Sequence, residues 1–125
     1  LRTSSQKVTI GIAGKYTSVR DSYASVIKAL EHSGTRCGVK VDIDWIEVSD
    51  MPLDDVSTRL AGVDGLIVPG GFGSRGVEGK ISCVQHARVH GIPYLGLCYG
   101  FQLAVIDYAR NVCGLDGAGS TEFNP

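Results

Sequence analysis

The chain has 125 residues, 43% of them hydrophobic and 20% charged, which is the composition of a globular domain able to bury a core. Its net charge is -1, with acids and bases spread along it, which argues against the basic face of a general nucleic-acid-binding protein. No apolar run is long enough for a secretion signal or a membrane span, so we expect a cytoplasmic protein.

Four short segments are predicted as strands. Residues 8–13 form an apolar run that ends at Gly14, and residues 39–48 alternate apolar and polar side chains, as a strand nearer a sheet edge does. Residues 66–68 are stopped by a Pro-Gly-Gly turn, and residues 92–97 run directly into Cys98. The continuous apolar runs predict strands that are buried on both faces.

Helical spacing fills the segments between these strands. From Asp21 onward, apolar residues recur at three and four positions, with Asp21 or Ser22 as the predicted N-cap and Gly34 as the predicted C-terminal stop. Three further helices are predicted over residues 54–60, over residues 79–90 with Gly91 as the stop, and from just after Cys98 to about Cys113, where Gly114 ends the helix.

Strands that alternate with helices predict an α/β fold with an open, mostly parallel sheet, right-handed crossovers and helices on both faces. The sequence contains no internal repeat, low-complexity tract or linker, so residues 1–125 are predicted to belong to one domain. In such sheets, ligands bind beyond the carboxyl ends of the strands. Two of the predicted strands end in glycine-rich turns, so we expect the chemistry at that edge.

Cys98 lies at a predicted strand-to-helix junction, with Gly96 two residues before it and Gly100 two residues after it. This is the pattern of a nucleophile elbow, in which only small residues fit beside the turn and the nucleophile projects above the sheet. A helix N-terminus favours a cysteine thiolate, and the N–H of Tyr99 would face a tetrahedral oxyanion. The alternative is a buried cysteine between two glycines that begin a helix.

A second glycine-rich run, Pro-Gly-Gly-Phe-Gly at 69–73, follows a different strand on the same edge of the sheet. Glycines allow backbone N–H groups to turn toward a ligand, so Gly71 is predicted as the second oxyanion donor. A phosphate-binding loop is the competing interpretation, but the run lacks the spacing and the lysine of a P-loop.

The remaining cysteines and the histidines are predicted to have no catalytic role. Three cysteines adjoin apolar stretches, which predicts buried free thiols: Cys37, Cys83 and Cys113. His86 and His90 are one helical turn apart, but a third metal ligand is missing, which favours a solvated helix face and predicts no metal. None of the histidines, His32 included, is assigned as a general base.

The segment Gly-Leu-Cys-Tyr-Gly-Phe-Gln around Cys98 resembles the active-site signature of the class I glutamine amidotransferases, whose fold is flavodoxin-like. Segments over nearly the whole chain resemble one branch of that family, the glutaminase domains of the CTP synthases. They include residues 14–16, 21–30, 68–73, 75–80, 102–105, 109–112 and the Ser-Thr-Glu-Phe-Asn-Pro run at 120–125. The last run is specific to that branch.

The resemblance implies a role for each matching residue. Cys98 would form a glutamyl thioester, and the N–H groups of Gly71 and Tyr99 would stabilise the oxyanion. Three side chains would line the glutamine pocket: Phe72, Gln102 and Glu122. A carboxylate such as Glu122 suits the α-ammonium group of glutamine.

The resemblance also implies what a longer enzyme would supply. The general base would be the histidine of a His-x-Glu pair, which this sequence lacks, so residues 1–125 are expected to be the N-terminal part of the amidotransferase domain and inactive alone. No cofactor is expected in this domain. A synthetase domain, also absent here, would use ATP and Mg²⁺ to aminate UTP, with GTP as activator of a homotetramer.

Other functions stay open on the sequence alone. The chain could belong to another class I amidotransferase. It could also be a hydrolase or peptidase with a cysteine elbow in a similar sheet. Such hydrolases lack the Gly-x-Gln continuation after the cysteine and the Ser-Thr-Glu-Phe run. A third possibility is a catalytically silent regulatory module that retains the signature without using it.

Overall fold

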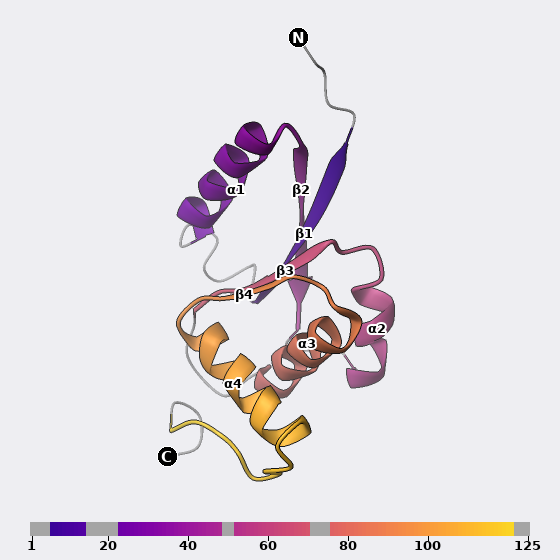
Figure 1. Ribbon diagram of the computed structural model, residues 1–125, viewed down its shortest axis with the longest axis vertical. Helices are drawn as coiled ribbons and strands as arrows, with labels where there is room; N and C mark the ends of the chain where they lie inside the picture. The colour runs from indigo at the N-terminus through magenta and orange to yellow at the C-terminus, as the bar shows by residue number, and fades with distance from the viewer. Residues whose placement is uncertain (1–5, 15–22, 49–51, 71–75, 122–125) are drawn as a thin grey trace.

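The computed structural model describes residues 6–14, 23–48, 52–70 and 76–121 (Figure 1). These residues form one four-stranded parallel sheet in the order β2-β1-β3-β4. Its strands are β1 (Lys7–Gly14), β2 (Lys40–Glu47), β3 (Gly65–Val68) and β4 (Tyr94–Gly96). The predicted parallel α/β sheet is confirmed, and the alternating strand lies at an edge of the described sheet, as expected.

The long strand β1 lies inside the sheet and organises it. It pairs with β2 along its whole length, from Lys7 opposite Lys40 to Gly14 opposite Glu47. On its other side it pairs with β3, which in turn pairs with β4. β2 lies on one side of β1, and the chain then crosses to the other side of β1 to form β3. The strand order therefore reverses between β1 and β3. In sheets of this kind, ligands bind at the carboxyl ends beside such a reversal.

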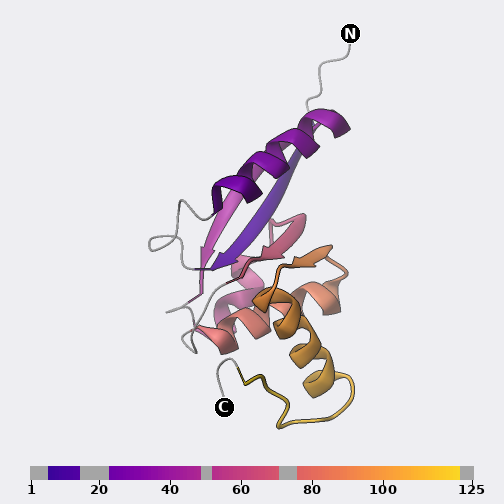
Figure 2. The ribbon, with the colours of Figure 1, turned by 90° about the vertical axis from the view of Figure 1, so that its left-hand side faces the viewer.

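Helices cover both faces of the sheet, as the alternation predicts. They are α1 (Ala24–Cys37), the 3₁₀ turn η2 (Leu53–Asp55), α2 (Val56–Arg59), α3 (Val77–His90) and α4 (Tyr99–Asn111). Figure 2 shows α1 on one side of the sheet and the other helices on the opposite side, where α3 contacts β1, β3 and β4. In the described ranges, no helix combines the length and the apolar character that a membrane span requires.

The first helix does not stop at Gly34, as the sequence predicts, but continues to Cys37. Gly34 is buried, and a β-carbon there would lie 2.8 Å from Cγ2 of Val41 and 3.0 Å from the carbonyl oxygen of Val39. This glycine therefore allows α1 to approach β2 closely. The helix stops instead at Gly38, which has the left-handed φ of 71° that favours glycine.

The other helix ends follow the sequence more closely. α3 stops at Gly91, whose φ is 69°, as predicted. α4 ends at Asn111, slightly before the predicted end, and Gly114 follows in the next turn with a φ of 74°. The predicted N-caps of the first helix, Asp21 and Ser22, lie outside the described residues.

The hydrophobic core lies between the sheet and the layer formed by α2, α3 and α4 (Figure 1). Its almost fully buried side chains include Ile46, Leu60, Leu66, Val68 and Leu103. β4 is shorter than predicted, and Leu95 at its centre is 53% exposed. The prediction that residues 92–97 are buried on both faces is therefore wrong, because β4 is an edge strand of the described sheet.

The three cysteines predicted to be buried differ in their environments. Cys83 is buried on α3 within the core. Cys37 and Cys113 are exposed, so the prediction is wrong for both. Cys37 is the last residue of α1 and Cys113 follows the end of α4, so each lies where the chain leaves a packed helix.

Candidate active site

Cys98 lies in the turn between β4 and α4, at the N-cap of α4, and is exposed. Its φ is 57° and its ψ is -105°. Among the residues that the structure describes, no other non-glycine residue has a positive φ. Such a conformation costs about 1–3 kcal/mol and persists where the surroundings hold it in place, most often at functional sites. The backbone thus has the strained turn that the sequence predicts, while the role of Cys98 as a nucleophile stays a prediction.

The glycines on either side of Cys98 are required by the space around the turn. A β-carbon on Gly96 would lie 2.6 Å from the carbonyl carbon of Gly100. One on Gly100 would lie 2.8 Å from the carbonyl carbon of Val68. These neighbours are backbone atoms of packed elements, so they cannot move aside as a flexible side chain can. Only glycine fits at both positions.

Two hydrogen bonds hold the elbow against the sheet. The N–H of Leu97 donates to the carbonyl oxygen of Val68 on β3 at 3.0 Å. The hydroxyl of Tyr94, on β4, donates to the carbonyl oxygen of Gly100 in the first turn of α4 at 2.7 Å. Burial raises the pKa of Tyr94 above its ordinary value, so the hydroxyl keeps the proton that it donates. The turn at Cys98 is therefore fixed from both of its ends.

The glycine-rich run after β3 begins next to Cys98. A β-carbon on Gly70 would lie 3.4 Å from Cβ of Cys98 and 4.0 Å from its Sγ. The backbone of Gly70 therefore lies against the cysteine side chain, so the second glycine-rich run begins at the same edge of the sheet as Cys98. Gly71 itself lies outside the described residues.

Tyr99, the first residue of α4, is buried beneath the elbow with 2% of its surface exposed. The Nζ atom of Lys80, from the first turns of α3, lies 5.7 Å from the centre of the Tyr99 ring. A cation over an aromatic face at this distance is attractive. This contact joins the N-terminal parts of α3 and α4 next to Cys98.

Gln102, one turn into α4, is half-buried and accepts a hydrogen bond from Ser120. The Ser120 hydroxyl lies 2.7 Å from Oε1 of Gln102. Ser120 reaches this position because the chain after α4 turns back and runs beside the helix (Figure 1). Arg110 anchors the returning segment by donating to the carbonyl oxygen of Ala118 at 2.7 Å, and it also pairs with Glu78 on α3.

Three of the predicted site residues lie outside the described residues: Gly71, Phe72 and Glu122. The structure therefore brings together Cys98, Tyr99 and Gln102 on the first turn of α4, with Gly70 beside the cysteine. Ser120, which contacts Gln102, is only two residues from Glu122 in the sequence.

The chain matches the family model described as "Glutamine amidotransferase class-I" over residues 18–123. It belongs to the class I glutamine amidotransferases. The matched range includes Gly70 and Cys98, which lie against each other at the carboxyl edge of the sheet.

This amidotransferase is similar to CTP synthases. It is 50% identical to the CTP synthase of Synechococcus sp. over 125 residues, which covers 100% of this chain and 23% of the relative. The Schizosaccharomyces pombe CTP synthase is 52% identical over 129 residues, covering 95% of this chain and 22% of the relative. The chain thus spans less than a quarter of the length of these relatives.

A solved structure is similar to the amidotransferase in both fold and sequence. The Trypanosoma brucei CTPS glutaminase domain with bound acivicin gives a TM-score of 0.86 at 42% identity, covering 94% of this chain and 46% of that chain. The described sheet and helices therefore have the arrangement found in part of that glutaminase domain.

The histidines of the amidotransferase lie away from the carboxyl edge that holds Cys98. His86 and His90 are in the last turns of α3, which lead into the amino end of β4. His32 lies in the second half of α1, which likewise leads into the amino end of β2. α1 continues five residues beyond His32, to Cys37.

The structure adds residues that the sequence does not single out. Tyr94 and Ser120 contact the elbow and Gln102, and Lys80 covers Tyr99. Asp107 is 1% exposed within α4, where it accepts from Nε of Arg88 at 2.8 Å. Of these residues, only Asp107 could have been noticed in the sequence, because it is an acid on the apolar face of α4. The other contacts depend on how separate segments meet in the fold.

Proposed function

We propose that this chain is part of the glutaminase domain of a CTP synthase and that Cys98 is its nucleophile. The observation that carries this proposal is the strained turn at Cys98, with φ of 57°, beside the backbone of Gly70. The 42% identity to the Trypanosoma brucei CTPS glutaminase domain and the 50% identity to a CTP synthase support it.

The first half of the reaction forms a thioester. The Sγ atom of Cys98 attacks the carboxamide carbon of glutamine, and the charge that develops on the carboxamide oxygen is stabilised by the N–H groups of Tyr99 and Gly71. The carbon–nitrogen bond then breaks, the nitrogen takes a proton, and ammonia leaves. The position of Tyr99 directly after the nucleophile, at the start of α4, supports its part in this step.

The second half returns the enzyme to its starting state. Water attacks the thioester, the carbon–sulfur bond breaks, and glutamate leaves with Cys98 restored as a thiol. Both halves need a general base, which the family resemblance assigns to the histidine of a His-x-Glu pair. This sequence contains no such pair, so we expect the 125-residue chain alone to release ammonia at background rate.

Gln102 and Glu122 would hold the amino-acid end of glutamine, with Phe72 beside it. Ser120 donates to Oε1 of Gln102, which leaves the NH₂ group of Gln102 to donate to a carboxylate or carbonyl oxygen of the substrate. The Glu122 carboxylate would pair with the α-ammonium group.

The complete enzyme would use the ammonia to aminate UTP. ATP and Mg²⁺ would be bound in a synthetase domain of the same polypeptide, with no cofactor among residues 1–125, which would form the N-terminal part of the amidotransferase domain. GTP would activate the glutaminase, and the enzyme would be a cytoplasmic homotetramer. The family resemblance implies these properties, and the similarity to CTP synthases supports the proposed use of ammonia in CTP synthesis.

A comparison of glutamine and ammonia as nitrogen sources for CTP synthesis tests this function in the full-length enzyme. Cys98→Ser should lower glutamine-dependent CTP formation by on the order of 10³-fold or more, because the thioester cannot form. Ammonia-dependent CTP formation should be unchanged, and Cys113→Ser should match the wild type in both assays because Cys113 lies at the far end of α4. Glutamine hydrolysis without CTP formation would point to another amidotransferase, and no hydrolysis at all would point to a silent module.

A further inference from the structure

The segment that returns along α4, residues 112–121, contains no buried residue (Figure 1). The structure describes all of it, and every residue is exposed except Ala118 and Ser120, which are half-buried. Leu115, the largest apolar side chain of the segment, is 59% exposed. Segments that bury little apolar surface open easily, so the position of this one depends on its hydrogen bonds.

The two half-buried residues are the ones that bond to side chains of α4. Ala118 accepts from Nε of Arg110 at 2.7 Å, and Ser120 donates to Oε1 of Gln102 at 2.7 Å. The Arg110 bond is part-buried, and its donor is charged, which makes such a bond about twice as strong as a neutral one. Ala118 also donates to the carbonyl oxygen of Leu115 at 2.9 Å. Arg110 is therefore bound to the turn that leads directly to Ser120.

The same guanidinium also binds α3. Nη1 of Arg110 lies 3.0 Å and 3.2 Å from the two carboxylate oxygens of Glu78. The Glu78 side chain is 63% exposed, so the pair adds little stability, but it holds the guanidinium from a second side. Arg110 therefore joins three parts of the chain: α3, α4 and the returning segment.

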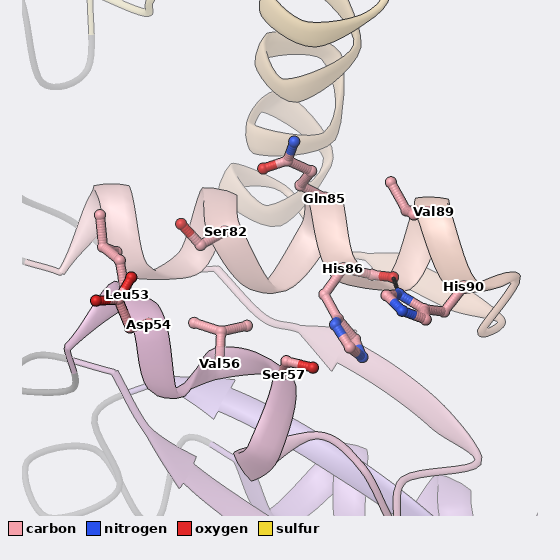
Figure 3. A pocket seen from close by; sticks show the side chains of 9 residues that line it. All are labelled: Leu53, Asp54, Val56, Ser57, Ser82, Gln85, His86, Val89 and His90. Carbon is pink, nitrogen blue, oxygen red and sulfur yellow. Dashed lines mark hydrogen bonds between the residues drawn. The ribbon is translucent and has the colours of Figure 1, made fainter.

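α3 is a fixed support for this contact. It lies between α4 and the η2–α2 segment, and a cavity of about 420 Å³ opens on the side that faces η2–α2 (Figure 3). Six of its fourteen residues are buried, Ile81 and Val84 among them. Arg88 of α3 also donates to the buried carboxylate of Asp107 on α4 at 2.8 Å. The returning segment is therefore tied through Arg110 to elements that are packed into the core.

We infer that Arg110 is a positioning residue for glutamine, because it holds the returning segment where Ser120 fixes the orientation of the Gln102 amide. This inference rests on the proposed function, in which Gln102 binds the substrate. Ser120 is also only two residues before Glu122 in the sequence, so the same segment leads to a second proposed pocket residue. The Arg110 guanidinium is bound to groups of the protein and acts on glutamine through them.

Steady-state glutaminase kinetics of the full-length enzyme test this inference. Arg110→Met removes the donors and keeps a long side chain, so it should raise KM for glutamine about fivefold or more while kcat changes less than about threefold. Arg110→Lys keeps the charge and can donate one bond, so its KM should lie between those of the wild type and Arg110→Met. Arg36→Met is the matched control, because Arg36 is exposed in the last turn of α1, on the opposite side of the sheet from α4. Its KM should equal that of the wild type.

Coupling to Ser120 separates positioning from a general loss of structure. If Arg110 acts through the Ser120 bond, the double variant Arg110→Met and Ser120→Ala should have the KM of Arg110→Met alone. A KM that multiplies the two single effects would overturn the inference. An unchanged KM in Arg110→Met, or an equal rise in Arg36→Met, would overturn it as well.

Amide hydrogen exchange, followed by mass spectrometry, tests the structural step without glutamine. In Arg110→Met, residues 113–121 should exchange about tenfold faster than in the wild type, while residues 99–109 of α4 should keep the wild-type rate. Unchanged exchange in residues 113–121 would overturn the inference even in an enzyme that hydrolyses glutamine. If the full-length enzyme hydrolyses no glutamine, the proposed function fails, and exchange alone decides whether Arg110 holds the segment.

Discussion

Ser120 donates a hydrogen bond of 2.7 Å to Oε1 of Gln102, although the two residues are 18 positions apart. The bond exists because the segment after α4 returns along the helix and is anchored there by Arg110. It determines which end of the Gln102 amide faces Ser120 and which end is left for a ligand. Ser120 is therefore a positioning residue for the proposed glutamine pocket.

Removal of the Ser120 hydroxyl should weaken glutamine binding without removing the nucleophile. We expect Ser120→Ala to raise KM for glutamine about 2- to 12-fold, corresponding to about 0.5–1.5 kcal/mol for one hydrogen bond, with a smaller effect on kcat. Ser120→Thr keeps a hydroxyl and should restore most of the affinity. Steady-state glutaminase kinetics of the full-length enzyme measure both parameters, and an unchanged KM in Ser120→Ala would show that the hydrogen bond does not orient Gln102.

A methyl group at Gly100 should disrupt the elbow itself. A β-carbon there would lie 2.8 Å from the carbonyl carbon of Val68, so we expect Gly100→Ala to lower the free energy of unfolding by about 1–3 kcal/mol and to displace Cys98. The control is Gly117→Ala, where a β-carbon would meet nothing within 4 Å, and its effect should stay within about 0.5 kcal/mol. Urea denaturation compares the two variants, and equal stabilities would contradict the described packing of α4 on β3.

The buried Asp107 carboxylate makes the α3–α4 contact sensitive to the loss of Arg88. Asp107 is 1% exposed and accepts from Arg88 at 2.8 Å and from Nδ2 of Asn111 at 2.9 Å. Arg88→Met leaves the carboxylate buried with one donor fewer, so we expect a loss of about 1.5–3 kcal/mol. Lys28→Met removes the exposed pair with Glu31 and should cost less than about 0.5 kcal/mol. Urea denaturation at neutral pH measures both, and a similar loss in the two variants would contradict this difference.

Native alkylation should distinguish the four cysteines. Cys37, Cys98 and Cys113 are exposed and should react with iodoacetamide at pH 8, whereas Cys83 is buried and should react only after unfolding. Peptide mapping by mass spectrometry measures the modification at each site. Rapid native labelling of Cys83 would contradict its place in the core.

Cys83 should also make the fold less stable in alkali. Burial raises the pKa of Cys83 from 9.0 to about 11, an effect that the charge of Arg59 opposes. Between these pH values the folded chain keeps a proton that the unfolded chain releases, so the free energy of unfolding falls as pH rises, by on the order of 2 kcal/mol. Cys83→Ala should reduce this slope in urea denaturation between pH 9 and 11. Part of the fall should remain, because the pKa of Tyr94 is also raised by burial.

The sequence predicts the order and type of the main elements because their apolar patterns are local. It is wrong about Gly34 because a glycine can end a helix or allow close packing, and only the contact with Val41 on β2 distinguishes these roles. It is wrong about the burial of residues 92–97 because burial depends on which strands pair, and β4 is at an edge of the described sheet.

The site shows the same division between local and distant information. The elbow at Cys98 is predictable because Gly96 and Gly100 each lie two residues from it in the sequence. At both positions a larger side chain would clash with the backbone, so the pattern itself indicates the turn. The contact of Ser120 with Gln102 and that of Tyr94 with Gly100 depend on how the returning segment and β4 meet α4. Neither partner can be identified from spacing alone.

The role of Cys98 is tested most directly by identifying which residue a diazoketone analogue of glutamine modifies. In the full-length enzyme, we predict one modification per chain on Cys98, prevented by excess glutamine, while Cys37 and Cys113 stay unmodified although they are exposed. Cys98→Ala should abolish the modification, and Cys113→Ser should retain it. Glutamine-protected modification of another residue, or modification that persists in Cys98→Ala, would contradict the assignment of Cys98 as the nucleophile.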